Sequence, residues 1–173
     1  DDVPNLMADL ERFLNDQNQP VPDLIKIGIA HYQFETIHPF LDGNGRIGRL
    51  LITLYLVSTG LLVKPSLYLS AFFERHKSLY YDNLSRARTH KDLTQWLKFF
   101  LEGIRLTSEN SILTFKAIIA LRAECEREIL ALGKKTKLAQ AALHLLYSNP
   151  ILDGQDLAAG LSVNISTALR LID

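Results

Sequence analysis

The sequence is poor in cysteine, in net charge and in long apolar runs, and each shortage excludes a class of protein. Its 173 residues include one cysteine, Cys125, which excludes an internal disulfide framework and a zinc site built from several cysteines. The 19 basic and 19 acidic residues cancel, so the chain as a whole is not a strongly electrostatic nucleic-acid or membrane binder. The longest apolar run, 50–63, is interrupted by polar residues and is shorter than the roughly 20 residues that cross a bilayer.

The composition favours a globular protein, and the two ends suggest part of a longer chain. With 47% apolar residues, the sequence has ample material for a buried core, which argues against intrinsic disorder. The N-terminus carries neither an initiator methionine nor the basic segment of an export signal, and the last residues stop within a helical pattern. We therefore expect a fragment of a soluble, cytoplasmic protein.

Apolar residues recur at helical spacing along almost the whole sequence, and strand-like alternation is nearly absent. This pattern predicts an all-α fold. The expected helices cover residues 6–14, 22–37, 46–57, 72–88, 93–106, 110–132, 138–146, 154–161 and 165 onward. Gly133 suits a cap for the helix before it. The basic run 134–137 suggests a boundary between a main domain over 1–133 and a small, incomplete appendage over 134–173.

The segment 38–49 reads HPFLDGNGRIGR, and its backbone is expected to form an anion-binding nest. Pro39 disfavours a helical conformation for His38, so the preceding helix should end just before this histidine. Gly43 and Gly45 permit dihedral angles and close approaches that side chains forbid. A helix that begins directly behind the loop, near residue 46, aims its free N–H groups and its dipole into the loop. Loop and helix start are therefore suited to phosphate groups.

The side chains of this segment add the chemistry that phosphate transfer needs. Arg46 and Arg49 stand three residues apart in the first helical turn, so they should share a face beside the nest, where an anionic ligand would offset the unfavourable dipole. Asp42 supplies a hard oxygen ligand for Mg²⁺. His38 has an ordinary histidine's ability to accept a proton near neutral pH.

Several neighbouring residues are expected to be structural. Phe40 and Leu41 should anchor the loop in the core. His31, on the helix before the loop, is interpreted as a structural histidine with Glu35 at i+4 as a possible surface partner. Cys125 lies within a helical pattern and is interpreted as a small apolar filler.

The segment 38–49 resembles the signature of the Fic family, H-x-F-x-[D/E]-G-N-G-R-x-x-R, and matches it at every fixed position. The stretches 6–10, 80–84 and 96–101 are also similar to Fic proteins, so the resemblance covers about 1–106. It implies an all-helical fold and a protein adenylyltransferase, which transfers AMP from ATP to a Tyr, Ser or Thr hydroxyl of a target protein or of itself and releases pyrophosphate.

The resemblance also assigns roles to single residues. His38 would be the base that deprotonates the target hydroxyl, and Asp42 would hold Mg²⁺ against the phosphates. Arg46, counted with His38 as catalytic, would act with Arg49 to neutralise the outer phosphates. At helical spacing only one of the two downstream tyrosines can face the site. The positions expected to contact the nucleotide are Asp42, Gly43, Asn44, Gly45, Arg46, Ile47, Gly48, Arg49, Tyr80 and Tyr81.

Other functions of the same loop stay open. Family members that transfer a terminal phosphate carry lysine where Gly45 stands, so Gly45 favours nucleotidyl transfer. The alternatives are a transferase that uses another nucleotide and a transcriptional regulator whose Fic domain only binds nucleotide. Many Fic proteins also carry an inhibitory [S/T]-x-x-x-E-[G/N] motif. Glu102 and Glu109 have the required following residue but lack the Ser or Thr, so we expect this motif to precede the sequence.

The segment 157–170 is typical of a helix-turn-helix, in which Val163 would plug the turn and Asn164 would cap the second helix. It resembles the winged helix that follows the catalytic core of many bacterial Fic proteins. No wing follows here, and Arg170 is the only basic residue of the second helix. Because DNA binding needs phosphate-neutralising charge, DNA is weakly supported as a partner, and contact with a protein or a second copy in a homodimer is at least as well supported.

Overall fold

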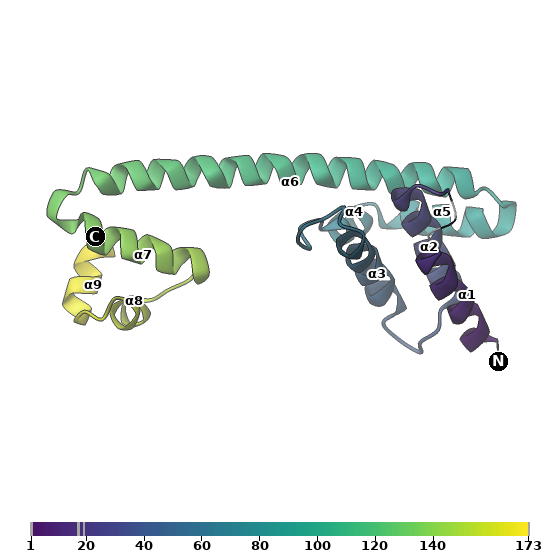
Figure 1. Ribbon diagram of the computed structural model, residues 1–173, viewed down its shortest axis with the longest axis horizontal. Helices are drawn as coiled ribbons and strands as arrows, with labels where there is room; N and C mark the ends of the chain where they lie inside the picture. The colour runs from purple at the N-terminus through teal and green to yellow at the C-terminus, as the bar shows by residue number, and fades with distance from the viewer. Residues whose placement is uncertain (1, 17, 19, 173) are drawn as a thin grey trace. The chain divides into compact units, whose positions relative to one another are not determined.

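The computed structural model describes residues 2–16, 18 and 20–172, and within them the chain forms nine α-helices and one 3₁₀ turn without any strand (Figure 1). The predicted all-α fold class is thereby confirmed. None of the helices in the described part of the chain combines the length and the apolar character that a membrane span needs. The chain divides into two compact units, 1–113 and 114–173.

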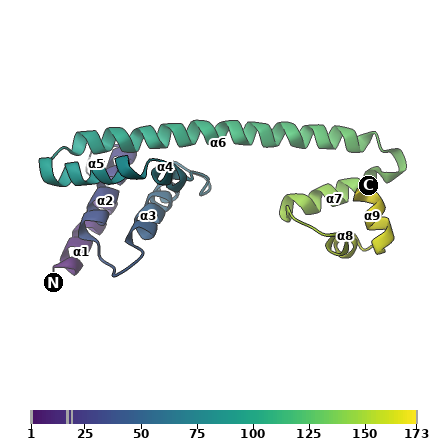
Figure 2. The ribbon, with the colours of Figure 1, turned by 180° about the vertical axis from the view of Figure 1, so that it is seen from behind.

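The first unit contains five complete helices and the first part of a sixth (Figures 1 and 2). The complete helices are α1 (Val3–Asn15), α2 (Asp23–Ile37), α3 (Asn44–Ser58), α4 (Leu69–Arg75) and α5 (Lys77–His90). Helix α2 packs against both α1 and α3. The loop 38–43 that carries the sequence motif therefore connects two helices that pack directly against each other.

The core of the first unit is built around α2. Ile27 and Ile52 are fully buried there, together with the large rings of Trp96 and Phe100. Trp96 donates its indole N–H to the carbonyl of Gly28 at 2.8 Å, and a Cβ on this glycine would lie 3.0 Å from Phe100. The close approach of α2 to the helix that carries Trp96 therefore depends on glycine at this position. The core fixes α2, and with it the end of α2 that leads into the loop.

Two predicted helix boundaries are wrong. The helix expected over 72–88 is two helices, α4 and α5, which meet at His76 with φ −112° and ψ 38°. No glycine or proline stands there, so the sequence carries no local signal for the break. The helices expected over 93–106 and 110–132 are a single helix, α6 (Leu93–Leu130). The residues between the two expected segments contain no helix breaker, which explains why the helix continues.

Helix α6 ends at Leu130, two residues before the predicted end, so Gly133 is not the cap of this helix and instead begins the 3₁₀ turn that follows. Gly133 has φ +58°, a left-handed conformation that glycine adopts without steric cost. The two compact units meet inside α6, ahead of this glycine. The domain boundary predicted between residues 133 and 134 stays a prediction.

The second unit comprises the last part of α6, the 3₁₀ turn Gly133–Lys135, α7 (Thr136–Ser148), α8 (Gly154–Leu161) and α9 (Ile165–Ile172). Asp153 caps α8 by accepting hydrogen bonds from the backbone N–H groups of residues 155 and 156. Asn164 accepts a bond from the Thr167 N–H at 2.9 Å, and Val163 packs on the small core of this unit. The predicted helices at 154–161 and from 165, the capping asparagine and the packed valine are confirmed.

Candidate functional site

The loop begins where α2 ends, at Ile37, as Pro39 predicts. His38 adopts a left-handed conformation, φ 51° and ψ 58°, that non-glycine residues rarely adopt, while its N–H still donates to the Phe34 carbonyl at 3.0 Å. Such a conformation costs on the order of 1–2 kcal/mol and persists where the surrounding structure imposes it. It turns the chain sharply at the helix end and leaves the imidazole exposed.

Asn44 closes the loop on itself. Its side-chain oxygen accepts a bond from the Phe40 N–H at 2.9 Å, and its amide donates to the Phe40 carbonyl at 2.6 Å. The residue is 2% exposed, so its side chain holds the loop, and its expected nucleotide contact stays a prediction. Helix α3 starts here, two positions before the predicted start at residue 46, because Gly43 accepts from the N–H groups of Arg46 and Ile47. The N–H groups ahead of these two remain for an anion.

The expectation that Phe40 and Leu41 anchor the loop in the core is wrong. Leu41 is fully exposed and Phe40 is 46% exposed, with its ring centroid 6.4 Å from that of Phe34. The two hydrogen bonds of Asn44 explain the difference, because they hold the loop through its backbone. The loop tip can therefore project its apolar side chains outward.

Asp42 and Arg46 form an ion pair at the loop surface. The Asp42 carboxylate lies 3.3 Å from the Arg46 guanidinium, and the side chains are 93% and 75% exposed. Because both are so exposed, the pair contributes little to stability and can be rearranged by a ligand. Gly43 has φ +83°, and a Cβ there would lie 3.4 Å from the same guanidinium. Glycine therefore gives both the turn and room for Arg46 at the loop.

Arg49 lies further along α3 and folds back toward its start. Its Nη1 atom would stand 3.1 Å from a Cβ at Gly45. The two arginines are thus both directed to the glycines of the loop, Arg46 to Gly43 and Arg49 to Gly45. A side chain at Gly45 would require the Arg49 guanidinium to shift by a few tenths of an ångström.

Glu35 lies at this site, and the expectation of a surface partner for His31 is wrong. One of its carboxylate oxygens, Oε1, is buried without a hydrogen-bond partner and lies against Gly48, where a Cβ would collide with it. Burial raises the pKa of the Glu35 carboxyl, while the positive charges of Arg49 and His38 oppose the rise. The spacing of Glu35 three residues before His38, at a helix end, is the signal that could have identified it.

His31 is structural, as interpreted, but its partners are not the expected one. It is fully buried; its Nδ1 donates to the Gly48 carbonyl at 2.9 Å, and its Nε2 accepts from the Tyr80 hydroxyl at 3.0 Å. Burial lowers the pKa of His31 to about 4, so the ring is neutral near pH 7. This histidine ties α2, α3 and α5 together behind the loop.

The two downstream tyrosines take different places. Tyr80 is buried in the core and is held by His31, whereas Tyr81 is 54% exposed. Tyr81 lines a hollow of about 220 Å³ at the end of α2, beside His38. The other residues around this hollow are Glu35, Thr36, Leu84, Ser85 and Arg88. Of the two tyrosines, Tyr81 is therefore the one positioned on the side of the loop histidine.

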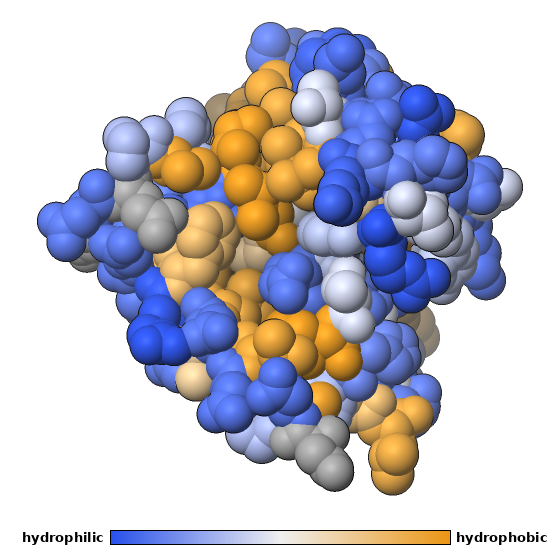
Figure 3. All heavy atoms as spheres, turned by 90° about the vertical axis from the view of Figure 1, so that its right-hand side faces the viewer, coloured by the Kyte–Doolittle hydropathy of each residue, from blue (hydrophilic) through white to orange (hydrophobic). Residues whose placement is uncertain are grey.

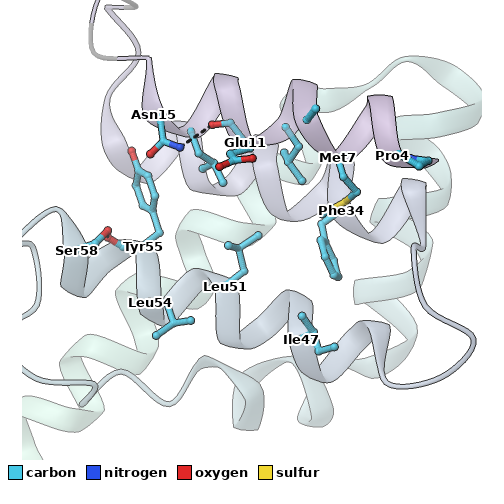
Figure 4. A pocket seen from close by; sticks show the side chains of 13 residues that line it. Pro4, Met7, Glu11, Asn15, Phe34, Ile47, Leu51, Leu54, Tyr55 and Ser58 are labelled. Atoms are coloured by element: carbon cyan, nitrogen blue, oxygen red, sulfur yellow. Dashed lines mark hydrogen bonds between the residues drawn. The ribbon is translucent and has the colours of Figure 1, made fainter. Parts of the chain in front are cut away.

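Ile47 and Gly48 have packing roles. Ile47 lines an apolar groove of about 610 Å³ between α1 and α3, where it lies near Met7 and Phe34 (Figure 4). Apolar side chains also gather in a band on the face of the first unit seen in Figure 3. Gly48 is buried against α2 and accepts from His31. Their expected nucleotide contacts stay predictions.

The described residues contain no cluster of three or more His, Cys, Asp or Glu side chains that could hold a metal ion by themselves. Mg²⁺ does not require such a cluster when phosphate oxygens and water complete its shell. The exposed carboxylate of Asp42, at the tip of the loop, fits that mode of binding.

Comparisons with known proteins identify relatives of this chain. Residues 1–56 match the model of the Fic/DOC family. The chain is 33% identical over 150 residues to a probable protein adenylyltransferase of Aquifex aeolicus (strain VF5). This match covers 78% of this chain and 46% of the relative. The chain is also 31% identical over 137 residues to the protein adenylyltransferase Fic of Nematostella vectensis. That match covers 75% of this chain and 30% of the relative.

A solved structure supports the same relationship. The crystal structure of a Fic family protein from Desulfovibrio desulfuricans G20 matches 98% of this chain with a TM-score of 0.63 and 29% sequence identity. The match covers 46% of that protein. This chain thus spans less than half the length of each of these relatives.

Proposed function

This chain belongs to the Fic/DOC family, and on that premise we propose that it is a protein adenylyltransferase that transfers AMP from ATP to a hydroxyl group of a protein. The observation that carries the proposal is the arrangement of the loop 38–49. An exposed histidine stands at the end of α2, and the start of α3 lies directly behind it with two arginines directed to the loop glycines. This combination offers a proton acceptor beside an anion site.

His38 is the base in this proposal. It takes the proton from the target hydroxyl as the hydroxyl oxygen attacks the α-phosphorus of ATP, and the bond from that phosphorus to the bridging oxygen breaks. Pyrophosphate leaves with the electron pair of the broken bond, and the target carries an AMP ester. The exposure of the imidazole beyond the helix end supports this role, because a protein hydroxyl can reach it.

The start of α3 holds the phosphates. Its free N–H groups and dipole attract anions, and Arg46 and Arg49 supply paired N–H donors that suit phosphate oxygens. Catalysis then rests on positioning and on stabilising the charge that spreads over the phosphate groups. The close approach of Arg46 to Gly43 and of Arg49 to Gly45 supports this arrangement.

Asp42 is the residue that would hold Mg²⁺. When bound, the ion would neutralise phosphate charge. Among the described residues Asp42 is engaged only by the exposed pair with Arg46, so both side chains can change partner when a nucleotide brings its phosphates.

Tyr81 is the proposed contact for the nucleoside. The hollow that it lines lies on the same side of the loop as His38 and is bordered by Leu84 and Arg88 from α5. An aromatic ring and an arginine are suited to the flat face of a base. Tyr80 supports the hollow from the core through its bond to His31.

For the appendage, a protein contact is the role that the structure favours over DNA. Helices α8 and α9 are joined by three residues, in the manner of a helix-turn-helix. On α9 the side chains of Ile165, Leu169 and Ile172 are exposed, and Arg170 is the only basic residue. An apolar outer face with little positive charge suits a protein surface, such as that of a second copy, better than phosphates.

Label transfer tests the proposed function. The chain is incubated with Mg²⁺, candidate protein targets and ATP that is labelled at the α-phosphate in one sample and at the γ-phosphate in another. We expect label on protein from the α position and none from the γ position. Label from the γ position would show phosphorylation, and a sample in which ATP neither binds nor labels any protein would contradict the proposal. The same assay with other nucleotides tests the alternative donor.

A further inference from the structure

Glu35 has an unusual environment for an acidic residue. Its Oε1 atom is buried without a hydrogen-bond partner in the described part of the chain, although a buried carboxylate oxygen ordinarily has one. It stands at the junction of α2 and α3, against Gly48 and 4.0 Å from the point that a Cβ of Gly45 would occupy. Leaving an acceptor unpaired is unfavourable, so a role other than stability is expected for it.

Arg49 faces Glu35 across the same glycine. Its Nη1 atom lies 3.1 Å from that Cβ point of Gly45, so the carboxylate and the guanidinium both lie beside the same position of α3. The structure contains no ion pair or hydrogen bond between the two side chains within the described residues. Arg49 is nevertheless the main charge that lowers the pKa of the Glu35 carboxyl against the effect of burial.

A cation near the start of a helix needs a counter-charge. The positive end of the α3 dipole and the neighbouring Arg46 both repel Arg49. Of the charged groups around Gly45, Glu35 is the negative one, since Asp42 is paired with Arg46. A hydrogen-bonded carboxylate would occupy the N–H donors of the guanidinium, whereas an attraction across Gly45 leaves them open.

We propose that Glu35 is a positioning residue, whose carboxylate holds the Arg49 guanidinium back over Gly45 and keeps its N–H donors free for the outer phosphate of the nucleotide. The inference rests on the proposed function, because it assumes that Arg49 meets a phosphate group. It gives Glu35 no contact with ATP. Its effect reaches the nucleotide only through Arg49.

A role through His38 makes a different prediction. Glu35 and His38 line the same hollow, so the carboxylate could instead stabilise the protonated imidazole during transfer. Loss of that role would lower kcat and leave ATP binding unchanged. Loss of the role through Arg49 weakens ATP binding, with kcat affected less.

The test compares Glu35→Gln with the unchanged chain by calorimetry, with ATP and Mg²⁺ in one series and adenosine in the other. We expect Glu35→Gln to raise the Kd for ATP by about 3- to 10-fold and to leave adenosine binding unchanged, because only ATP carries the phosphates that Arg49 meets. Removing a negative charge near a phosphate would by itself tighten ATP binding. A weaker affinity therefore reports lost positioning.

Two further variants make the result specific. Glu74→Gln, the same substitution at an exposed residue of α4, should leave both affinities unchanged. In an Arg49→Ala background, Glu35→Gln should have no further effect on ATP binding. If Glu35→Gln fails to fold, Glu35→Asp replaces it. Glu35→Asp keeps the negative charge but moves it back, and it should show a smaller loss of ATP affinity than is expected for Glu35→Gln.

The outcomes separate this inference from the proposed function. Unchanged or tighter ATP binding by Glu35→Gln would overturn the positioning role, as would a loss that persists when Arg49 is absent. A fall in kcat with normal ATP binding would also overturn it and assign Glu35 to His38. If the unchanged chain itself binds no ATP, the proposed function fails first. If it binds and transfers normally while Glu35→Gln matches it, the inference alone fails.

Discussion

A histidine inside α2 and a histidine directly after its last residue show how position decides what the same side chain can do. His31 lies in the middle of α2, fully buried, with both ring nitrogens bonded and a pKa lowered to about 4. His38 follows the last residue of the same helix, in a left-handed conformation, with an exposed ring. The first can neither gain a proton near pH 7 nor reach a ligand. The second is exposed to a ligand, so the buried region behind the loop is a support and the loop is the part that a ligand can reach.

The largest expected effect distinguishes the two histidines by activity. His38→Ala should reduce transfer by about 10²–10⁴-fold, because it removes the group that takes the proton. ATP binding should stay within a few-fold of the unchanged chain, since the imidazole does not bind the phosphates. Transfer is measured with labelled ATP and binding by calorimetry. Unchanged transfer by this variant would remove His38 from the mechanism.

The second prediction concerns the buried histidine and pH. Because the pKa of His31 is about 4 in the folded chain and near 6.5 when unfolded, the unfolded chain binds more protons between these values. The contribution of His31 to stability is therefore full above pH 6.5 and is lost as the pH falls toward 4. The loss is on the order of 3 kcal/mol over that window.

Substitutions isolate this contribution from the other groups that titrate in the same range. His31→Gln keeps polar atoms that can bond to Gly48 and Tyr80 but does not titrate. Urea unfolding at several pH values should give a flatter profile for His31→Gln than for the unchanged chain. Parallel profiles for His31→Gln and the unchanged chain would show that the buried ring does not control acid stability.

Local signals in the sequence predicted the backbone of the loop. The contacts that surround the loop could be identified only from the structure. Pro39 predicted the end of α2, and the glycines predicted the turn at Gly43, because both act on the backbone of their own neighbourhood. Glu35 looked like a surface partner of His31 because spacing along a helix shows only which residues share a face. Its burial depends on α3, which packs over it, and no property of α2 alone reports that contact.

The same distinction explains the misplaced helix boundaries. The break at His76 has no glycine or proline to mark it, so packing and not local propensity places it. Two helices were expected where α6 is continuous. The apolar pattern weakens near residue 107, but no residue there ends a helix. Exposed Leu41 shows the converse, since an apolar residue in a loop is buried only when the loop backbone brings it to the core.

The third prediction concerns Gly48, which contacts both the buried support around His31 and the site around the loop. Gly48 accepts from His31 through its carbonyl and lies against Glu35 through its Cα. In Gly48→Ala the new Cβ would collide with Glu35 and lie 3.1 Å from the Phe34 ring and 3.2 Å from that of His31. We expect the variant to lose about 1–2 kcal/mol of unfolding free energy in urea, since buried rings yield little. A gain in stability, as helix propensity alone would give, would contradict this packing.

The smallest expected effect belongs to the exposed end of the loop, where Asp42 pairs with Arg46. Asp42→Ala should leave the free energy of unfolding unchanged, because an ion pair this exposed adds little to stability. Transfer at low Mg²⁺ should fall by about tenfold, since a lost carboxylate ligand weakens the metal contact that neutralises the phosphates. Raising Mg²⁺, or replacing it with Mn²⁺, should restore part of the activity.

The measurement is the initial rate of label transfer across a series of metal concentrations. A rate that ignores both the substitution and a chelator would exclude the metal role of Asp42. A rate that falls equally at every metal concentration would assign Asp42 to holding Arg46 instead.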